Sequence, residues 1–419
     1  MNDLQRAILR EVESEFAAAT AFLAELVKVP TDNPPGDCAA HGARAAELLT
    51  ALGHPVEVHP VPAEDLAAVQ MISASNLIVR HAFGDGGPCI ALNAHGDVVP
   101  PGLGWSVDPY GAVVRDDPQH GPVMYGRGVA VSKSDFATYT FALRALQRLV
   151  AAGTLALRGR VELHFTYDEE VGGEIGPAWL LRHGLSRPDY ALSAGFSYAV
   201  TTAHNGCLHL EVTVRGQQGH AAMPKSGRDA LEAATGVLAA LYASRAALAT
   251  QHSATHGIDS PTLNIGLISG GINTNVVPDK VSFRLDRRII PEESAEAAEA
   301  ALRTLIADSA ARYPGITVDI RRLMLAKPLV KLPGAETLTA ALQKHGAAYF
   351  GTSIIEHGVP LYTDARHYTA AGIPTVLYGA GPRTLAEANG HGADECLRLN
   401  DLKRATATVA ALLADLLAA

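Results

Sequence analysis

The first two hundred residues alternate between helical and strand-like hydrophobic patterns. Apolar residues recur at helical spacing in three segments, and short continuous apolar runs, typical of buried strands, separate them. The predicted helices cover about residues 4–27, 37–52 and 134–152, and the predicted strands cover 89–94, 161–165 and 189–193. This alternation is typical of an α/β sheet, in which ligands bind at the ends of the strands.

Near residue 203 the pattern changes to strict alternation of apolar and polar residues. Leu208, Leu210, Val212 and Val214 alternate with polar side chains, which predicts a strand with one solvent-facing side. The segments that follow it are predicted as helix 227–248, strands 262–269 and 280–288, helix 292–313 and strand 316–321. The resulting order, β-α-β-β-α-β, is that of a split ferredoxin-like unit.

After about residue 327 the α/β pattern returns, with helices at 336–345 and 401–417 and a strand at 374–378. We therefore expect an α/β protein in which an inserted α+β domain, residues 203–326, interrupts a larger domain made of residues 1–202 and 327–419. The insert has about the size of a domain that folds independently.

Composition narrows the class of partner. The chain has 419 residues, of which 48% are hydrophobic and 18% charged, as in ordinary globular proteins. A formal charge of -9 argues against nucleic acid or an anionic membrane as partner, so a small molecule is the expectation. The four scattered cysteines form no CxxC pair, the first residues are charged, and no run reaches about 18 apolar residues. We expect a cytoplasmic protein.

An acidic turn follows the predicted strand 161–165. Asp168, Glu169 and Glu170 are consecutive there, and three carboxylates in one turn repel one another unless a cation or a shared proton relieves them. Without a metal ion, we expect protonation or a cation such as Lys133 or Arg127 to relieve the charge.

Two histidine segments offer partners for this turn. His95 and Asp97 come just after strand 89–94, at a spacing that lets the carboxylate hold the second ring nitrogen of a metal-bound imidazole. Adjacent Glu169 and Glu170 point in different directions, so one can bind a metal ion while the other activates a water. His391 can complete such a site. Each piece alone is also compatible with a solvated loop.

Taken together, these pieces resemble the M20 family of metallohydrolases over nearly the whole chain. The motifs that carry the resemblance are His95–Pro100, Tyr125–Gly128, Asp168–Glu170 with Gly172 and Gly173, Arg215–His220, Gly270–Pro278, Thr363–Arg366 and His391. The resemblance implies a three-layer α/β/α catalytic domain with an inserted ferredoxin-like lid and dimerisation domain. It also implies a homodimer that forms through the lid.

The resemblance further implies a role for each matching residue. Glu169 is then the general base, His95, Glu170 and His391 are metal ligands, and Asp97 orients His95. On the lid, His220 reaches across the dimer to stabilise the oxyanion, Arg288 holds the substrate carboxylate, and Asn275 is a polar contact beside it. Arg284, on the same strand face, is the competing carboxylate ligand.

Two ligand positions of the family lack a donor here. The aspartate that bridges two metal ions corresponds to Val131, and a further acidic ligand corresponds to Gly195. Asp135 lies four residues past the expected bridge, inside the predicted helix, where we do not expect it to replace the missing aspartate. Because catalytic zinc needs about three protein ligands, a tight two-ion centre is not expected. We therefore expect the site to hold either one weakly bound divalent ion (Zn, Mn or Co) or no ion.

The predicted function is hydrolysis of an amide-like C–N bond in a small carboxylate-bearing substrate, with water activated by Glu169. A metal-free isomerase or lyase on the same scaffold is an open alternative. A non-catalytic protein that binds a small molecule is another.

Overall fold

A computed structural model describes all residues, 1–419. The chain forms two compact units. Unit 1 comprises Met1–Thr202, Lys331–His357 and Thr363–Ala419, and unit 2 comprises Ala203–Val330 and Gly358–Tyr362. The sequence predicts domain boundaries at 202/203 and 326/327. As the limits of domains that fold independently, these boundaries stay a prediction.

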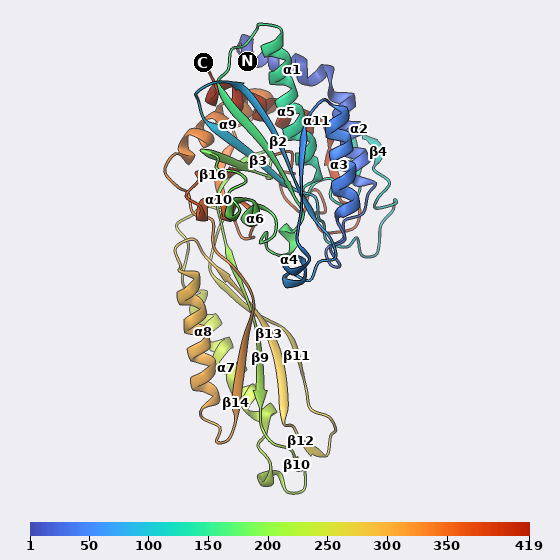
Figure 1. The fold of residues 1–419 in the computed structure, drawn as a ribbon. Helices are drawn as coiled ribbons and strands as arrows, with labels where there is room; N and C mark the ends of the chain where they lie inside the picture. The colour runs from blue at the N-terminus through green and yellow to red at the C-terminus, as the bar shows by residue number, and fades with distance from the viewer. The chain divides into compact units, whose positions relative to one another are not determined.

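The main sheet has eight strands in the order β1-β2-β6-β3-β7-β16-β8-β15 (Figure 1). The strands are β1 (Val56–Pro60), β2 (Ser75–Gly84), β3 (Cys89–His95), β6 (Gly159–Thr166), β7 (Tyr190–Ser193), β8 (Ala199–His204), β15 (Ile355–Val359) and β16 (Thr375–Leu377). The central strands β6, β3, β7 and β16 run parallel, and the pair β1–β2 is antiparallel. A smaller sheet joins β4 (Val113–Asp117), β5 (Gly121–Tyr125) and β17 (Cys396–Arg398).

Helices cover both faces of the main sheet, which confirms the three-layer α/β/α architecture. Along β6, Val161, Leu163 and Phe165 belong to the larger core beneath one helical layer, whereas His164 points to the other face. The larger layer contains α1 (Asp3–Ser14), α2 (Phe16–Val27), α3 (Ala39–Ala51), α5 (Lys133–Ala151), α9 (Ala335–Phe350) and α11 (Leu399–Leu416). The opposite layer contains α6 (Pro177–Arg182) and α10 (Ala365–Ala370).

The first predicted helix, 4–27, is wrong in one respect, because α1 and α2 are separate helices. The break falls at Glu15, whose backbone leaves the helical region at φ -105° and ψ 6°. The Glu15 carboxylate accepts hydrogen bonds from the Arg144 guanidinium of α5. Apolar spacing continues through the break, so the pattern alone could not reveal it.

Unit 2 has the predicted β-α-β-β-α-β order. Its elements are β9 (Gly206–Arg215), α7 (Ala230–Leu248), β11 (Thr262–Gly270), β13 (Lys280–Ile289), α8 (Ala295–Ala310) and β14 (Thr317–Ala326). The four strands form an antiparallel sheet in the order β11-β13-β9-β14, which is the ferredoxin-like arrangement. Both helices pack on one face, over Leu208, Leu210, Val212 and Val214 of β9 (Figure 1). The other face is free of helices.

The sequence pattern missed the long strand β2 and most of the shorter elements. These are β1, β2, β4, β5, β8, β15, β17, α6, α10 and the helix α4 (Ala63–Ala68). Short strands give too few repeats to establish a period, and tertiary pairing decides them. None of the helices combines the length and the apolar composition needed to cross a membrane.

Candidate active site

The acidic turn and His95 lie at the same edge of the main sheet. Strands β3 and β6 are parallel neighbours, with His95 opposite Thr166, and the Gly96 amide donates to the Thr166 carbonyl at 2.8 Å. Because both strands end together, the segment after β3 lies beside the short 3₁₀ helix η1 (Glu169–Val171) that follows β6. Their parallel pairing thus brings together two motifs that are more than seventy residues apart.

Asp97 holds this junction. Its buried carboxylate accepts the backbone amides of Glu169 at 3.2 Å and Glu170 at 3.1 Å. It also accepts the side-chain amide of Asn33 at 3.0 Å. Three donors on one carboxylate fix the direction in which the two glutamates leave the turn.

His95 faces the two glutamates. Its Nδ1 lies 3.0 Å from the carbonyl oxygen of Asp97 and 3.4 Å from the Asp97 carboxylate, so the residue predicted to orient the ring contacts it. Its Nε2 lies 3.9 Å from a Glu169 carboxylate oxygen. Donor atoms of His95, Glu169 and Glu170 all lie within 4.8 Å of one another, as ligands of one ion do.

His391 reaches the same group through Glu170. Its Nε2 lies 3.4 Å from Glu170 Oε1. Pairing of Cys396 in β17 with Tyr125 in β5 places the loop that carries His391 next to the turn after β5. The structure therefore brings together His95, Glu170 and His391, the three predicted metal ligands. Their role as ligands stays a prediction.

A buried ion pair secures the His391 loop. The Arg127 guanidinium contacts the Glu395 carboxylate at 2.5 Å, and both side chains are about 1% exposed. Arg127 also donates to the carbonyls of His391 and Gly392, at 3.2 and 3.1 Å. Glu395 in turn accepts the Ala130 amide at 3.0 Å. Glu395 had no role assigned from the sequence, because only the fold shows that it neutralises a buried arginine.

Burial changes the protonation of the group. It raises the pKa of Glu169 well above its usual range, and Glu170 adds to this while His95 opposes it. Burial alone would lower the pKa of His95, but Glu169 and Asp97 outweigh it and hold that pKa well above normal. Burial also raises the pKa of Asp364 to about 7. These shifts favour protonation of the group when no metal ion is bound.

Of the two expected ways to relieve the acidic turn, protonation agrees with the raised pKa of Glu169, whereas the two cations named, Lys133 and Arg127, are paired elsewhere. The Lys133 ammonium donates to the backbone carbonyls of Val29 at 3.0 Å and Leu26 at 3.4 Å. The Arg127 guanidinium pairs with Glu395 and donates a hydrogen bond to the His391 carbonyl. Both side chains serve the packing around the site, which their positions in the sequence could not reveal.

A two-ion centre does not fit these residues. A Cβ atom at Gly195 would lie 2.8 Å from the Leu377 Cβ and from the Tyr378 amide nitrogen, so this backbone has no space for an acidic side chain there. Val131 has no donor atom. The Asp135 carboxylate accepts the amides of Ala380 at 2.7 Å and Gly195 at 3.2 Å, so it is engaged with the backbone. Of the remaining donors, His95, Glu169 and Glu170 lie within reach of one ion, and His391 lies beside Glu170.

Three further residues of the site, Asp364, Arg366 and His367, had no role assigned from the sequence. The side chains of Arg366 and His367 on α10 both contact the carbonyl of Gly172, just after η1. Asp364 precedes them, and a Cβ at Gly173 would lie 2.2 Å from its Oδ1. The motif Thr363–Arg366 indicated the segment, but its contact with the acidic turn needed the three-dimensional structure.

The four lid residues predicted to act on the substrate all lie in unit 2. His220 lies in the two-stranded ribbon of β10 (Gly219–His220) and β12 (Val276–Val277), where the Ala221 amide donates to the Asn275 carbonyl at 3.1 Å. Arg288 lies near the other end of β13 and makes two hydrogen bonds to Asp286. Arg284 pairs with Glu211 at 2.8 Å.

Comparison with known proteins identifies the family. Residues 91–415 match the model of "Peptidase family M20/M25/M40". The chain belongs to the M20 peptidase family. It is 29% identical over 340 residues to a succinyl-diaminopimelate desuccinylase of Acidiphilium cryptum, covering 78% of this chain and 83% of the relative. It is 28% identical to an acetylornithine deacetylase of Myxococcus xanthus, covering 80% and 82%.

Solved structures agree on the fold. An M20 family metallo-carboxypeptidase from Sulfolobus solfataricus superposes with a TM-score of 0.75 at 15% identity, covering 94% of this chain and 98% of that one. A dinuclear metal-binding M20 peptidase of Bacillus subtilis superposes with a TM-score of 0.66 at 16% identity, covering 97% and 99%. The resemblance, the fold class and the assignment as a hydrolase of C–N bonds are confirmed. The family favours a hydrolase over a metal-free isomerase, a lyase or a binding protein.

We expect the buried ion pair between Arg127 and Glu395 to contribute strongly to the free energy of unfolding. Glu395→Gln keeps the shape of the side chain but leaves the buried guanidinium uncompensated, so the free energy of unfolding should fall by about 3–5 kcal/mol. The matched control is Glu387→Gln in the same loop, which breaks a more exposed pair with Arg398 and should cost about 1 kcal/mol or less. Urea unfolding followed by the fluorescence of Trp105 and Trp179, both in unit 1, measures the difference. Equal losses in the two variants would refute it.

We expect the buried carboxyl of Asp135 to make the free energy of unfolding depend on pH. Burial raises its pKa to about 7, against the partial relief that two backbone amides give. In the unfolded chain the Asp135 carboxyl ionises at its ordinary pKa of 3.8, whereas in the folded protein it stays protonated up to about pH 7. The folded state therefore loses stability relative to the unfolded state as the pH rises from the first value through the second. Asp135→Asn removes this term, so between pH 5 and pH 8 wild type should lose about 3 kcal/mol more stability than the variant. Urea unfolding at both pH values checks this, and parallel losses in the two proteins would contradict it.

Proposed function

We propose that this M20 protein hydrolyses an amide-like C–N bond in a small carboxylate-bearing substrate, with Glu169 as general base. The supporting observation is the convergence of His95, Glu169 and Glu170 where β3 and β6 end. Carboxylates in a nearly buried setting, beside an imidazole, are suited to activating water.

One divalent ion would be held by His95, Glu170 and His391. This set provides two imidazoles and one carboxylate, which matches a catalytic zinc site with an open position for water. When bound, the ion would lower the pKa of that water and polarise the scissile carbonyl. Whether it is zinc, manganese or cobalt is not fixed by these ligands, because all three accept nitrogen and oxygen donors.

The protein's own residues then move the proton. The Glu169 carboxylate takes a proton from the attacking water and gives it to the departing nitrogen. Its raised pKa makes it a stronger base once it is ionised. Asp97 keeps Glu169 and Glu170 pointing apart through their backbone amides, so that one side chain stays available for water while the other binds the ion.

The relatives suggest the class of substrate. The desuccinylase and the deacetylase are named for removing acyl groups from diaminopimelate and ornithine, both amino acids that carry a carboxylate. We propose an N-acylated amino acid or a dipeptide for this protein. Arg288 would bind its carboxylate, since a guanidinium forms two parallel hydrogen bonds with a carboxylate and already does so with Asp286. Arg284 remains the competing residue.

His220 and Asn275 would act on the active site of a second copy. They lie near Val276, just before β13 begins at Lys280, whereas Arg288 lies eight residues farther along that strand. At about 3.4 Å per residue, roughly 27 Å separates the two ends, more than a small substrate spans. A homodimer through the lid brings one copy's His220 to the site served by the other copy's Arg288. The cytoplasmic location stays a prediction.

The base is tested by Glu169→Gln. Turnover of N-succinyl-diaminopimelate, N-acetylornithine or a dipeptide, whichever wild type hydrolyses, should fall by about 10²–10⁴-fold, while the Michaelis constant changes little. Glu174→Gln, in the same loop but half exposed, is the matched control and should keep its activity. Steady-state kinetics of both variants gives the comparison. An active Glu169→Gln enzyme, or a wild type that hydrolyses none of the panel in the presence of zinc, manganese or cobalt, would exclude this function.

The action of His220 in trans is tested by mixing two inactive variants. When Glu169→Gln and His220→Ala subunits are unfolded and refolded together in equal amounts, hybrid dimers contain one site with both native residues. Activity should return to about a quarter of the wild-type value, because one site in four is then complete. If His220 acts within its own chain, the mixture stays as inactive as its components.

A further inference from the structure

One face of the lid sheet carries a series of polar cross-strand pairs. This face lies opposite the helices α7 and α8, and on it β9 and β13 place Thr213 opposite Ser282 and Glu211 opposite Arg284. The same register places His209 opposite Asp286, and Cys207 opposite Arg288. The last two pairs bring a thiol, an imidazole and a carboxylate together at the end of the series.

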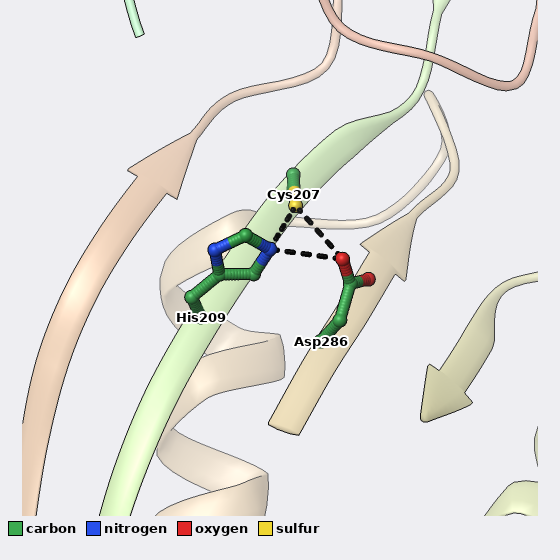
Figure 2. A group of neighbouring side chains, drawn as sticks. All are labelled: Cys207, His209 and Asp286. Atoms are coloured by element: carbon green, nitrogen blue, oxygen red, sulfur yellow. Dashed lines mark hydrogen bonds and ion pairs between the residues drawn. The ribbon is translucent and has the colours of Figure 1, made fainter. Parts of the chain in front are cut away.

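Three donor atoms of this group converge on one point. Figure 2 shows the His209 ring with Nε2 turned towards both neighbours and Nδ1 turned away. The His209 Nε2 lies 2.9 Å from Asp286 Oδ2 and 3.3 Å from the Cys207 sulfur. The sulfur lies 3.7 Å from the same Asp286 oxygen. Every donor therefore faces the other two.

This geometry does not suit a nucleophilic relay. In a catalytic triad the histidine uses one ring nitrogen for the nucleophile and the other for the carboxylate. Here a single nitrogen, Nε2, faces both the sulfur and the carboxylate. The Cys207 side chain is also fully buried, so no substrate reaches its sulfur directly. Convergence on one centre is instead how ligands surround a metal ion.

The spacing agrees with a tetrahedral ion. Bonds of about 2.0–2.3 Å to nitrogen, oxygen and sulfur give ligand-to-ligand separations of roughly 3.3–3.7 Å. Two of the three observed separations, 3.3 and 3.7 Å, already fall in that range. The third pair, at 2.9 Å, needs to part by only a few tenths of an ångström. Because His209 is 37% and Asp286 26% exposed, an ion has an entry path and water can supply the fourth ligand.

Arg288 completes the arrangement as a support for the carboxylate. Its Nε donates to Asp286 Oδ1 at 2.9 Å, which leaves Oδ2 directed at His209 and Cys207. A hydrogen bond to the second oxygen of a ligating carboxylate orients it for the metal. The guanidinium also contacts Oδ2 at 3.1 Å, and that contact would loosen on metal binding.

We propose that Cys207, His209 and Asp286 form a zinc site in the lid of this M20 protein. On binding, the thiol loses its proton to solvent, and His209 binds as the neutral imidazole with its single ring proton on Nδ1, so that Nε2 holds the ion. The thiolate and the carboxylate then balance the two positive charges of the ion. Thiolate, imidazole and carboxylate together are a donor set that zinc accepts. The set of His95, Glu170 and His391 contains no sulfur, so the two sites differ in chemistry.

Cobalt substitution tests the site, because only a thiolate ligand gives a strong sulfur-to-cobalt charge-transfer band in the near ultraviolet. The full-length protein, freed of metal by chelation and kept reduced, is titrated with Co²⁺. Wild type should develop this band up to one equivalent per chain, and one equivalent of Zn²⁺ should abolish it. No band in wild type overturns the proposal. Since a Co²⁺ ion held by His95, Glu170 and His391 lacks sulfur, loss of hydrolysis leaves this result unaffected.

Matched variants assign the band. Cys207→Ser should abolish it, whereas Cys89→Ser, another buried cysteine, should keep it. His209→Ala should weaken Co²⁺ binding at this site by at least about tenfold, whereas His252→Ala, which breaks an exposed His–Asp pair of the same unit, should not. His209 is partly exposed, so its variant remains a test if Cys207→Ser does not fold. A band that survives both Cys207→Ser and His209→Ala overturns the proposal.

Discussion

The active site depends on one carboxylate that is not itself proposed as a ligand. Asp97 follows β3, yet it receives the backbone amides of two residues that follow β6. Without it, parallel pairing would still bring the strand ends together, but the turn would be free to direct Glu169 and Glu170 elsewhere. Asp97 fixes the backbone of the turn and does not contact the two glutamate side chains through these bonds. The fixed backbone makes the side chains of Glu169 and Glu170 point in different directions. One glutamate can then face an ion while its neighbour faces water.

At Val131 and Gly195, where the resemblance leads us to expect acidic ligands, this chain offers no side-chain donor, and the backbone around Gly195 is closely packed. The space that an acidic side chain would need at residue 195 is closed by the strand that ends at Leu377. Asp135 secures that closure by accepting amides from both sides, at Gly195 and Ala380. Both oxygens of this carboxylate are thus engaged by backbone amides. The site that we propose therefore holds one ion, with its donors on the η1 turn, His95 and His391.

The sequence predicted most of this fold, because long amphipathic helices and alternating strands such as β9 have a clear period. It also predicted which residues meet at the active site, since residues at the ends of neighbouring parallel strands must lie close together. It could not predict the pairing of Arg127 with Glu395, which depends on β17 lying beside β5. Nor could it show that Lys133 is directed at backbone carbonyls, because the residues beside it in the sequence give no sign of its partner.

The lid sheet illustrates the same limit more sharply. Cys207 and His209, two residues apart on a strand, must share a face, but their third partner depends on the register between β9 and β13. A shift of one residue would remove Asp286 from that face. In the observed register, Asp286 is shared between His209 and Arg288, the residue proposed to bind substrate. An ion on Asp286 Oδ2 would leave Arg288 held through Oδ1 alone, so the guanidinium would be freer to turn towards a substrate carboxylate. The proposed zinc site and the proposed substrate contact of the lid thus meet at one side chain, Asp286.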